Sequence, residues 1–427
     1  MKEKRKNLLK ISSFQILIMF RRGLFYSFLS IYLRSFLGLS VTETTFFATF
    51  PMIVNIIFQN FICGNVSDKY QKRRTLIILG EFFAAIGTVL TWYFHYGQSS
   101  KTTAGYIIIA GLCVIEIFWS MSNLGWTAII SDLFALKERA SVRGKLSSIG
   151  GFGRIIGVLI GGLAYDGMSY HYEGWGFESG LLFFIAAGVM LLSSIPIFFL
   201  PEGGVSKSEM VKNEEEDQLL DKETRRKKVK LFIIFIISMA FINFGRNSIA
   251  TIKAQFFTLD EGLNLSSQML SYIVNMRSLA TILIGVFIGF MVKAVNERWL
   301  LFLGAVLALI HLIGFVVFDT IAVLFFINFL GGVSHVVILA TSYAVASEMI
   351  PPKNRARLFA IYNATNFLSW GIAGTFIAGP VADFLMSQGY SQVKSYKGSF
   401  SVAALMTTMG ILILLFFNYR CYKKLNS

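Results

Sequence analysis

The sequence predicts an all-α integral membrane protein with twelve transmembrane helices in two pseudo-symmetric six-helix bundles. Of the 427 residues, 55% are hydrophobic and only 15% are charged, whereas a soluble chain carries about 25% charged residues. Residues 180–200 and 399–418 contain no charge at all, and about 20 apolar residues are enough to cross a bilayer. Six apolar spans lie on each side of one long polar segment. These observations exclude a soluble enzyme, a disordered protein and a nucleic-acid-binding module.

Apolar runs of about 18 to 28 residues, bounded by charged or turn residues, define the predicted spans. In chain order they are 11–37, 44–67, 75–96, 105–131, 146–166, 180–200, 231–257, 268–292, 299–318, 321–348, 358–386 and 397–419. The first run follows a basic N-terminal segment and is too long for the core of a cleaved signal peptide. We therefore interpret it as a retained anchor.

Basic residues gather on one side of the predicted membrane. If the N-terminus is cytoplasmic, 29 of the 39 Lys and Arg residues fall in cytoplasmic segments and five near the outer ends of spans. Basic residues of short loops stay in the cytoplasm, so the pattern predicts a multi-pass protein, expected in the plasma membrane, with both termini cytoplasmic. Topology and contact with the lipid bilayer account for the net charge of +15 without a nucleic acid partner.

The polar segment divides the chain into two related halves. We expect an N-terminal six-helix bundle at 1–200, a cytoplasmic linker at 201–230 and a C-terminal six-helix bundle at 231–427. The halves align at Phe20-Arg21-Arg22-Gly23 with Phe244-Gly245-Arg246-Asn247, at Ser131-Asp132 with Ser347-Glu348, and at Gly157, Gly162 and Asp166 with Gly374, Gly379 and Asp383. Such internal symmetry is typical of transporters. One chain provides the whole translocation unit, so a monomer suffices.

The segment between the second and third spans carries a motif, Gly64-Asn65-Val66-Ser67-Asp68-Lys69-Tyr70-Gln71-Lys72-Arg73-Arg74. It resembles the loop motif of the major facilitator superfamily, Gly-x-x-x-Asp-Arg/Lys-x-Gly-Arg-Arg/Lys, and departs from it at Gln71. The resemblance implies a secondary transporter that works by alternating access. It also implies a cytoplasmic gate in which Gly64 allows close helix contact, Asp68 caps a helix, and Lys72 or Arg73 pairs with Asp132. A plain basic loop is the competing interpretation.

Glycines recur in the fifth span at Gly153, Gly157, Gly161 and Gly162. This spacing resembles the Gly-x-x-x-Gly-Pro-x-x-Gly-Gly motif of exporters and drug/proton antiporters in the same superfamily, with Val158 in place of the proline. Close helix packing explains the glycines equally well. The alternative function is therefore a multidrug-type proton antiporter that exports lipophilic compounds.

Basic residues within the spans outnumber the acidic ones. The five basic residues are Arg21, Arg22, Arg154, Arg246 and Arg277. Only Glu116 and Glu81 oppose them at depth, and a charge in the membrane interior requires water, a partner or a ligand. Arg22 and Arg246 are equivalent in the repeat, and a guanidinium group binds carboxylate or phosphate in a bidentate manner. We expect them to bind an anionic organic substrate, whereas Arg21 and Arg154 could instead make structural bonds.

Further polar and aromatic residues are candidates for the same substrate site. They are Tyr26, Asn243, Asn363, Asn366 and Trp370. Polar contacts between helices are the competing interpretation for these residues.

Glu116 and His335 are candidates for proton coupling, so a proton gradient is the expected energy source. A hydrogen-bonded packing role is the alternative for His335. We expect no cofactor, no metal and no enzymatic activity, because the chain has no Walker loop, no metal-ligand spacing and no nucleophile–base arrangement. The predicted function is a secondary active transporter of a small anionic solute.

Overall fold

The computed structural model describes residues 2–63, 72–134, 136–203, 222–350 and 355–425, and every regular element in these ranges is helical. Contacts divide the chain into two compact units. Unit 1 comprises Met1–Ser206 and Ala254–Ile282, and unit 2 comprises Lys207–Lys253 and Leu283–Ser427. Residues Ala254–Ile282 therefore belong to unit 1 by their contacts, although they follow the predicted linker in the sequence. The middle of that linker lies outside the described residues.

Within the described residues, eleven helices are long and apolar enough to cross a membrane, or twelve if one bent pair is a single span. This confirms the predicted all-helical membrane fold. The helices of unit 1 are α1 (Lys2–Ile31) with the π-helical turn η1 (Tyr32–Phe36), α2 (Val41–Phe58) with η2 (Gln59–Cys63), α4 (Arg73–Tyr96), α5 (Lys101–Leu133), α6 (Leu136–Tyr165), α7 (Trp175–Glu178), α8 (Leu181–Phe198) and α10 (Lys253–Phe257), whose last four residues are in this unit. The helix α11 (Ser267–Ala294) contributes its residues up to Ile282.

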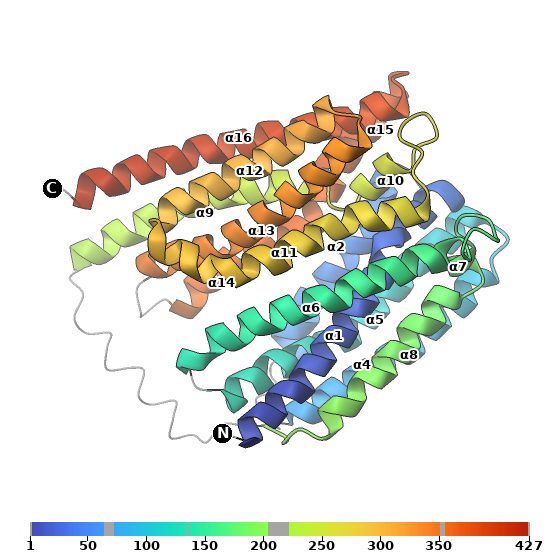
Figure 1. Cartoon of the computed structure of the whole chain (residues 1–427), viewed down its shortest axis with the longest axis horizontal. Coiled ribbons are helices and arrows are strands. Elements are labelled where there is room, and N and C mark those ends of the chain that lie inside the picture. Colours follow the sequence, from blue (N-terminus) through green and yellow to red (C-terminus); the bar gives the residue numbers. More distant parts are fainter. Residues whose placement is uncertain (1, 64–71, 135, 204–221, 351–354, 426–427) are drawn as a thin grey trace. The chain divides into compact units, whose positions relative to one another are not determined.

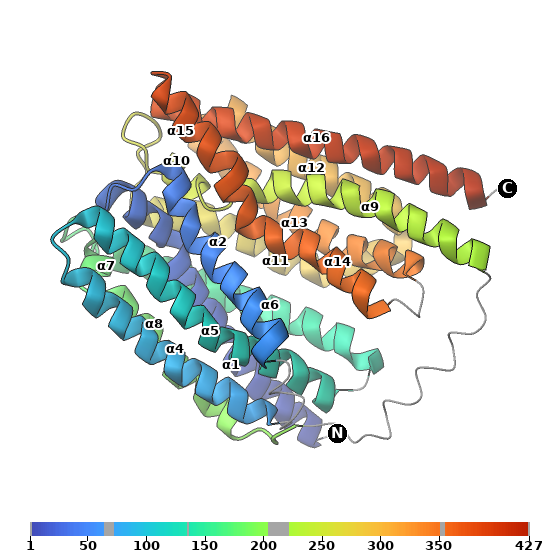
Figure 2. The same ribbon diagram turned by 180° about the vertical axis from the view of Figure 1, so that it is seen from behind.

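In unit 1, α1 lies along α6 and α8, and α4 lies along α5 and α8 (Figures 1 and 2). The seam between α1 and α6 explains the glycine pattern of the predicted fifth span. A Cβ at Gly153 or Gly157 would overlap a backbone carbonyl of α1, and one at Gly161 would lie 2.6 Å from the carbonyl oxygen of Leu24. Glycine at every fourth position thus lets the two helix backbones touch, as in other small-residue seams within membranes.

The first part of α11 is held in unit 1 by hydrogen bonds from its polar side chains. Ser267 donates to the carboxylate of Asp166 at 2.6 Å, and Ser271 and Asn275 donate to backbone carbonyls of α6 at 3.1 Å each. In an apolar environment, hydrogen bonds from polar side chains hold neighbouring helices together. These bonds account for the assignment of this segment to unit 1.

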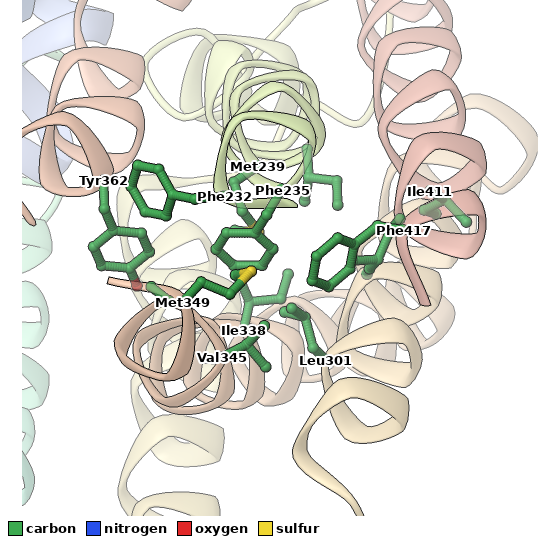
Figure 3. Close-up of a cluster of buried hydrophobic side chains, with 14 of the residues drawn as sticks. Phe232, Phe235, Met239, Leu301, Ile338, Val345, Met349, Tyr362, Ile411 and Phe417 are labelled. Carbon is green, nitrogen blue, oxygen red and sulfur yellow. The ribbon is translucent and has the colours of Figure 1, made fainter. Parts of the chain in front are cut away.

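Unit 2 contains α9 (Lys222–Ser248), the rest of α11, α12 (Glu297–Val317), α13 (Ile321–Met349), α14 (Arg355–Phe367), η7 (Leu368–Trp370), η8 (Gly374–Ala378), α15 (Gly379–Ser387) and α16 (Gln392–Leu425). Its core gathers side chains from α9, α12, α13, α14 and α16. Figure 3 shows Phe235 of α9, Met349 of α13 and Phe417 of α16 converging in this cluster, with Tyr362 of α14 at one edge.

The predicted span at 358–386 is broken in the structure. The segments Ile361–Trp370 and Gly374–Ser387 meet at a 53° bend. The 3-10 turn η7 and the π-helical turn η8 adjoin the break, and Gly371 lies between them. Pro380 follows within the first turn of α15 and lacks the backbone N–H that a continuous helix requires. A bent span places side chains near position 370 beside a helix end rather than on a regular helical face.

Candidate polar site in the membrane interior

Arg246 lies at the centre of a buried polar cluster in unit 2. Its Nε donates to Asn243 Oδ1 at 2.9 Å, and its Nη2 donates to Asn366 Oδ1 at 3.2 Å. Its Nη1 lies 3.1 Å from His335 Nδ1. These four residues, here called the Arg246 cluster, come from α9, α13 and α14. The sequence analysis had singled out all four as site residues, and the structure brings them together.

The partners of Arg246 are themselves fixed by neutral hydrogen bonds. Asn243 donates to Thr365 Oγ1 at 3.4 Å, and Asn247, on the next turn of α9, donates to Ser369 Oγ at 2.7 Å. The His335 and Trp370 rings meet edge to face with centroids 6.1 Å apart. These bonds fasten α9 to the segment before the bend.

The charge of Arg246 is the unusual feature of this cluster. Only 9% of Arg246 is exposed, and none of its three hydrogen bonds goes to a carboxylate. In the described part of the chain no ion pair includes it. A guanidinium group has five N–H donors, so two remain beyond these three bonds, one on each terminal nitrogen. The cluster therefore presents an uncompensated positive charge with free donors, which suits an anionic ligand.

Arg21 in unit 1 provides a contrast, because it is neutralised. Its Nη1 lies 2.6 Å from Glu81 Oε2, and the side chains are 4% and 1% exposed. Ser122 donates to the other carboxylate oxygen at 2.7 Å, and the guanidinium carbon lies 4.1 Å from the centroid of the Trp119 ring. The sequence analysis named Glu81 as one of two acidic residues at depth but did not assign it as the partner of Arg21.

Glu116 lies on α5 and accepts a hydrogen bond from Asn55 Nδ2 of α2 at 2.6 Å. It also interacts electrostatically with Arg22 and Arg21. The ring of Tyr26 lies near Trp119, with centroids 6.3 Å apart. Glu116 and Tyr26 therefore line one interior region of unit 1.

The other substrate candidates are more exposed. Arg22, the repeat equivalent of Arg246, is exposed and makes no hydrogen bond or ion pair with another described residue. Asn363 is likewise exposed on α14 and outside the Arg246 cluster. Asn363 thus lies outside the polar clusters, whereas Arg22 interacts with Glu116 electrostatically but without a hydrogen bond.

Three of the five predicted gating residues can be located. Gly64 and Asp68 lie outside the described residues. Lys72 is exposed immediately before α4, and Arg73 Nε lies 3.7 Å from Asp132 Oδ2, with both side chains buried. The structure therefore joins the start of α4 to the end of α5 by an ion pair.

A contact at the same end of unit 1 was not predicted. Glu202, just beyond α8, accepts a hydrogen bond from the backbone of Thr75 at 3.0 Å and pairs with Arg74 at 3.0 Å. A carboxylate at a helix N-terminus satisfies free backbone donors and complements the helix dipole. The acidic residue after the sixth predicted span and the basic pair before the third were the signals available in the sequence.

The described residues contain no group of three or more His, Cys, Asp or Glu side chains that could hold a metal ion.

In the described part of the chain, eleven to twelve apolar helices with polar clusters inside them define an integral membrane protein of the transporter class. The family model of the Major Facilitator Superfamily matches residues 11–259 and 235–424. The chain belongs to this superfamily and is a multi-pass secondary transporter, not an enzyme. The search for curated relatives by sequence found no match.

Solved structures show the same fold. A D-xylose–proton symporter matches with a TM-score of 0.73 and 15% identity, covering 96% of each chain. The nucleoside transporter NupG matches with a TM-score of 0.68 and 14% identity over 97% of this chain and 98% of its own. A bacterial homologue of the human lysosomal transporter Spinster, in an inward-facing and occupied conformation, matches with a TM-score of 0.70 and 15% identity over 96% of each chain. At such identities the likeness concerns the fold alone.

Proposed function

We propose that this chain is a proton-coupled carrier of a small anionic organic solute, such as an organic acid or a phosphorylated compound. The observation that supports the proposal is Arg246, a buried guanidinium group held by three neutral partners with two donors left over. A buried cation without a carboxylate is costly in the membrane interior. Binding an anionic substrate offsets this cost.

The proposal draws on the difference between two buried arginines, Arg21 and Arg246. Arg21 has its counter-charge in Glu81, so it needs none from a ligand. Arg246 has none among the residues bonded to it, and Asn366, Asn243 and Trp370 add donors and an aromatic face around it. We propose that Arg22, Tyr26 and Asn363 also contribute to substrate binding.

Proton coupling is proposed through Glu116 and His335, the two titratable side chains that adjoin these polar groups. The D-xylose–proton symporter shares this fold, which supports proton symport as a use of the architecture. We further propose a plasma-membrane location with both termini cytoplasmic, a monomeric working unit, and a cytoplasmic gate formed by Gly64, Asp68, Lys72, Arg73 and Asp132.

No observation favours the multidrug exporter over the anion carrier. The glycines that resembled an exporter motif are accounted for by the α1–α6 seam. Stabilisation of the protein by lipophilic cations is therefore one of the outcomes that the test below distinguishes.

The test is a thermal-stability screen of the purified protein against anionic, neutral and cationic solutes. We expect stabilisation by one or more anions and its loss in Arg246→Gln. The matched control is Arg298→Gln, which removes the same charge from a partly exposed ion pair with Glu348 and should leave the stabilisation intact. Stabilisation only by neutral or cationic compounds would refute the proposal.

A further inference from the structure

The bond between Arg246 and His335 fixes the protonation state of the histidine. Arg246 Nη1 and His335 Nδ1 are 3.1 Å apart. A guanidinium group can only donate, so Nδ1 must be the acceptor and carry no proton. The imidazole is therefore neutral, with its proton on Nε2. A protonated His335 would donate from both nitrogens and could not accept this bond.

Protonation of His335 would change the cluster in two ways. The bond to Nη1 would be lost, which frees a third N–H of Arg246. A second positive charge would also stand next to the first, and like charges at this distance disfavour each other. The other partners of Arg246, Asn243 and Asn366, are neutral and cannot compensate. An anion that binds between the guanidinium and the imidazolium would relieve both effects.

The titratable and charged groups around His335 come from several elements. Arg246 faces it from α9, and the Tyr362 hydroxyl, bonded to Ser342 at 2.7 Å, lies further along α13 and α14. From α12, the ring of His311 contacts Gly331, one turn before His335. The acidic Glu348 is thirteen residues along α13, roughly 20 Å at 1.5 Å per residue. Of these groups, Arg246 is the one that the structure places within hydrogen-bond distance of His335.

We infer that His335 is the residue that couples the proton to the anion, because its protonation and anion binding at Arg246 require each other. This inference rests on the proposed function. A proton from water adds to the lone pair of Nδ1, the Arg246–His335 hydrogen bond breaks, and no covalent bond forms. One monoanion then enters with one proton. When the anion leaves, Nδ1 releases its proton and accepts from Arg246 again.

Such linkage has a measurable size. Where anion binding takes up one proton, the apparent Kd rises about tenfold per pH unit. This holds between the pKa of His335 in the free protein and its pKa in the complex. Binding of succinate, lactate or glucose 6-phosphate, whichever stabilises the protein in the screen, is measured by calorimetry from pH 5.5 to 8. Two buffers of different ionisation enthalpy give the number of protons taken up.

We expect an uptake approaching one proton in the wild type. In His335→Gln the side-chain carbonyl still accepts from Arg246 but cannot be protonated, so the uptake falls to zero and Kd no longer depends on pH. His171→Gln, at an exposed histidine of unit 1, should retain the wild-type uptake.

The outcomes separate the inference from the proposed function. If no anion binds, or if binding does not depend on Arg246, the proposed function fails. If an anion binds through Arg246 but His335→Gln takes up as many protons as the wild type, only the inference fails. If His335→Gln does not fold, His335→Asn replaces it. Zero proton uptake by the wild type across the pH range overturns the inference without any variant.

Discussion

Replacing Glu81 with glutamine tests the buried ion pair of unit 1. Arg21 and Glu81 are 2.6 Å apart with side-chain exposures of 4% and 1%. Glutamine keeps the size and one oxygen of the side chain but removes the charge that opposes the guanidinium. Breaking a buried pair by removing one partner costs about 3–5 kcal/mol in soluble proteins. Because Trp119 and Glu116 also interact with Arg21, we expect the lower end, about 3 kcal/mol.

The assay is equilibrium unfolding in mixed micelles, with SDS as denaturant and helicity as the signal. The matched control is Glu348→Gln, which breaks the pair with Arg298. That pair is 2.8 Å long, but its side chains are 22% and 47% exposed, so the loss should not exceed about 1 kcal/mol. The double variant Arg21→Met with Glu81→Gln should recover part of the lost stability. A Glu81→Gln protein no less stable than Glu348→Gln would refute the reasoning.

Two further predictions concern the glycine seam and the loop between α6 and α7 in unit 1. Gly157→Leu should abolish stable folding because it forces α6 away from α1. Gly188→Leu should fold normally, because a Cβ at Gly188 would meet nothing within 4 Å. Equal yields of monodisperse protein from the two variants would contradict the proposed close packing of α1 and α6. Partial desolvation and the charges of Asp166 and Asp260 raise the pKa of Glu173 above its ordinary value. The protonated Glu173 side chain therefore contributes to the stability of the folded protein at low pH, and this contribution is lost as the pH rises through the raised pKa. As the pH rises above ~4.3, the free energy of unfolding should therefore fall less in Glu173→Gln than in the wild type. Parallel plots of unfolding free energy against pH for the two proteins would contradict this.

Much of the fold could be predicted from the sequence, because a bilayer imposes the length of each apolar run. The runs at 75–96 and 299–318 correspond closely to α4 and α12. The break near Trp370 was not predicted, since no charged residue interrupts the run at 358–386 before Asp383. A glycine pair and one proline permit a bend but do not require it. Whether the span bends depends on how its two halves pack against the neighbouring helices.

Polar partners were harder to predict than spans. Arg22 and Arg246 occupy equivalent positions in the repeat, yet Arg246 is buried among neutral acceptors and Arg22 is exposed. The choice of Glu81 for Arg21 depends on how α1 and α4 are rotated against each other. Residue type and depth show that an interior arginine needs a partner. They do not show which helix supplies it.

The most direct test of the central claim is transport by protein reconstituted in proteoliposomes. A pH gradient is imposed, and uptake of the anion that stabilises the wild type is compared in the wild type and in Arg246→Lys. Lysine keeps the charge but loses the planar fork and its bonds to Asn243 and Asn366. Loss of one charge-assisted hydrogen bond corresponds to about 1.5–3 kcal/mol, so we expect about 10- to 150-fold weaker apparent affinity. Uptake that is unchanged in Arg246→Lys, or that is confined to cationic solutes, would contradict the account.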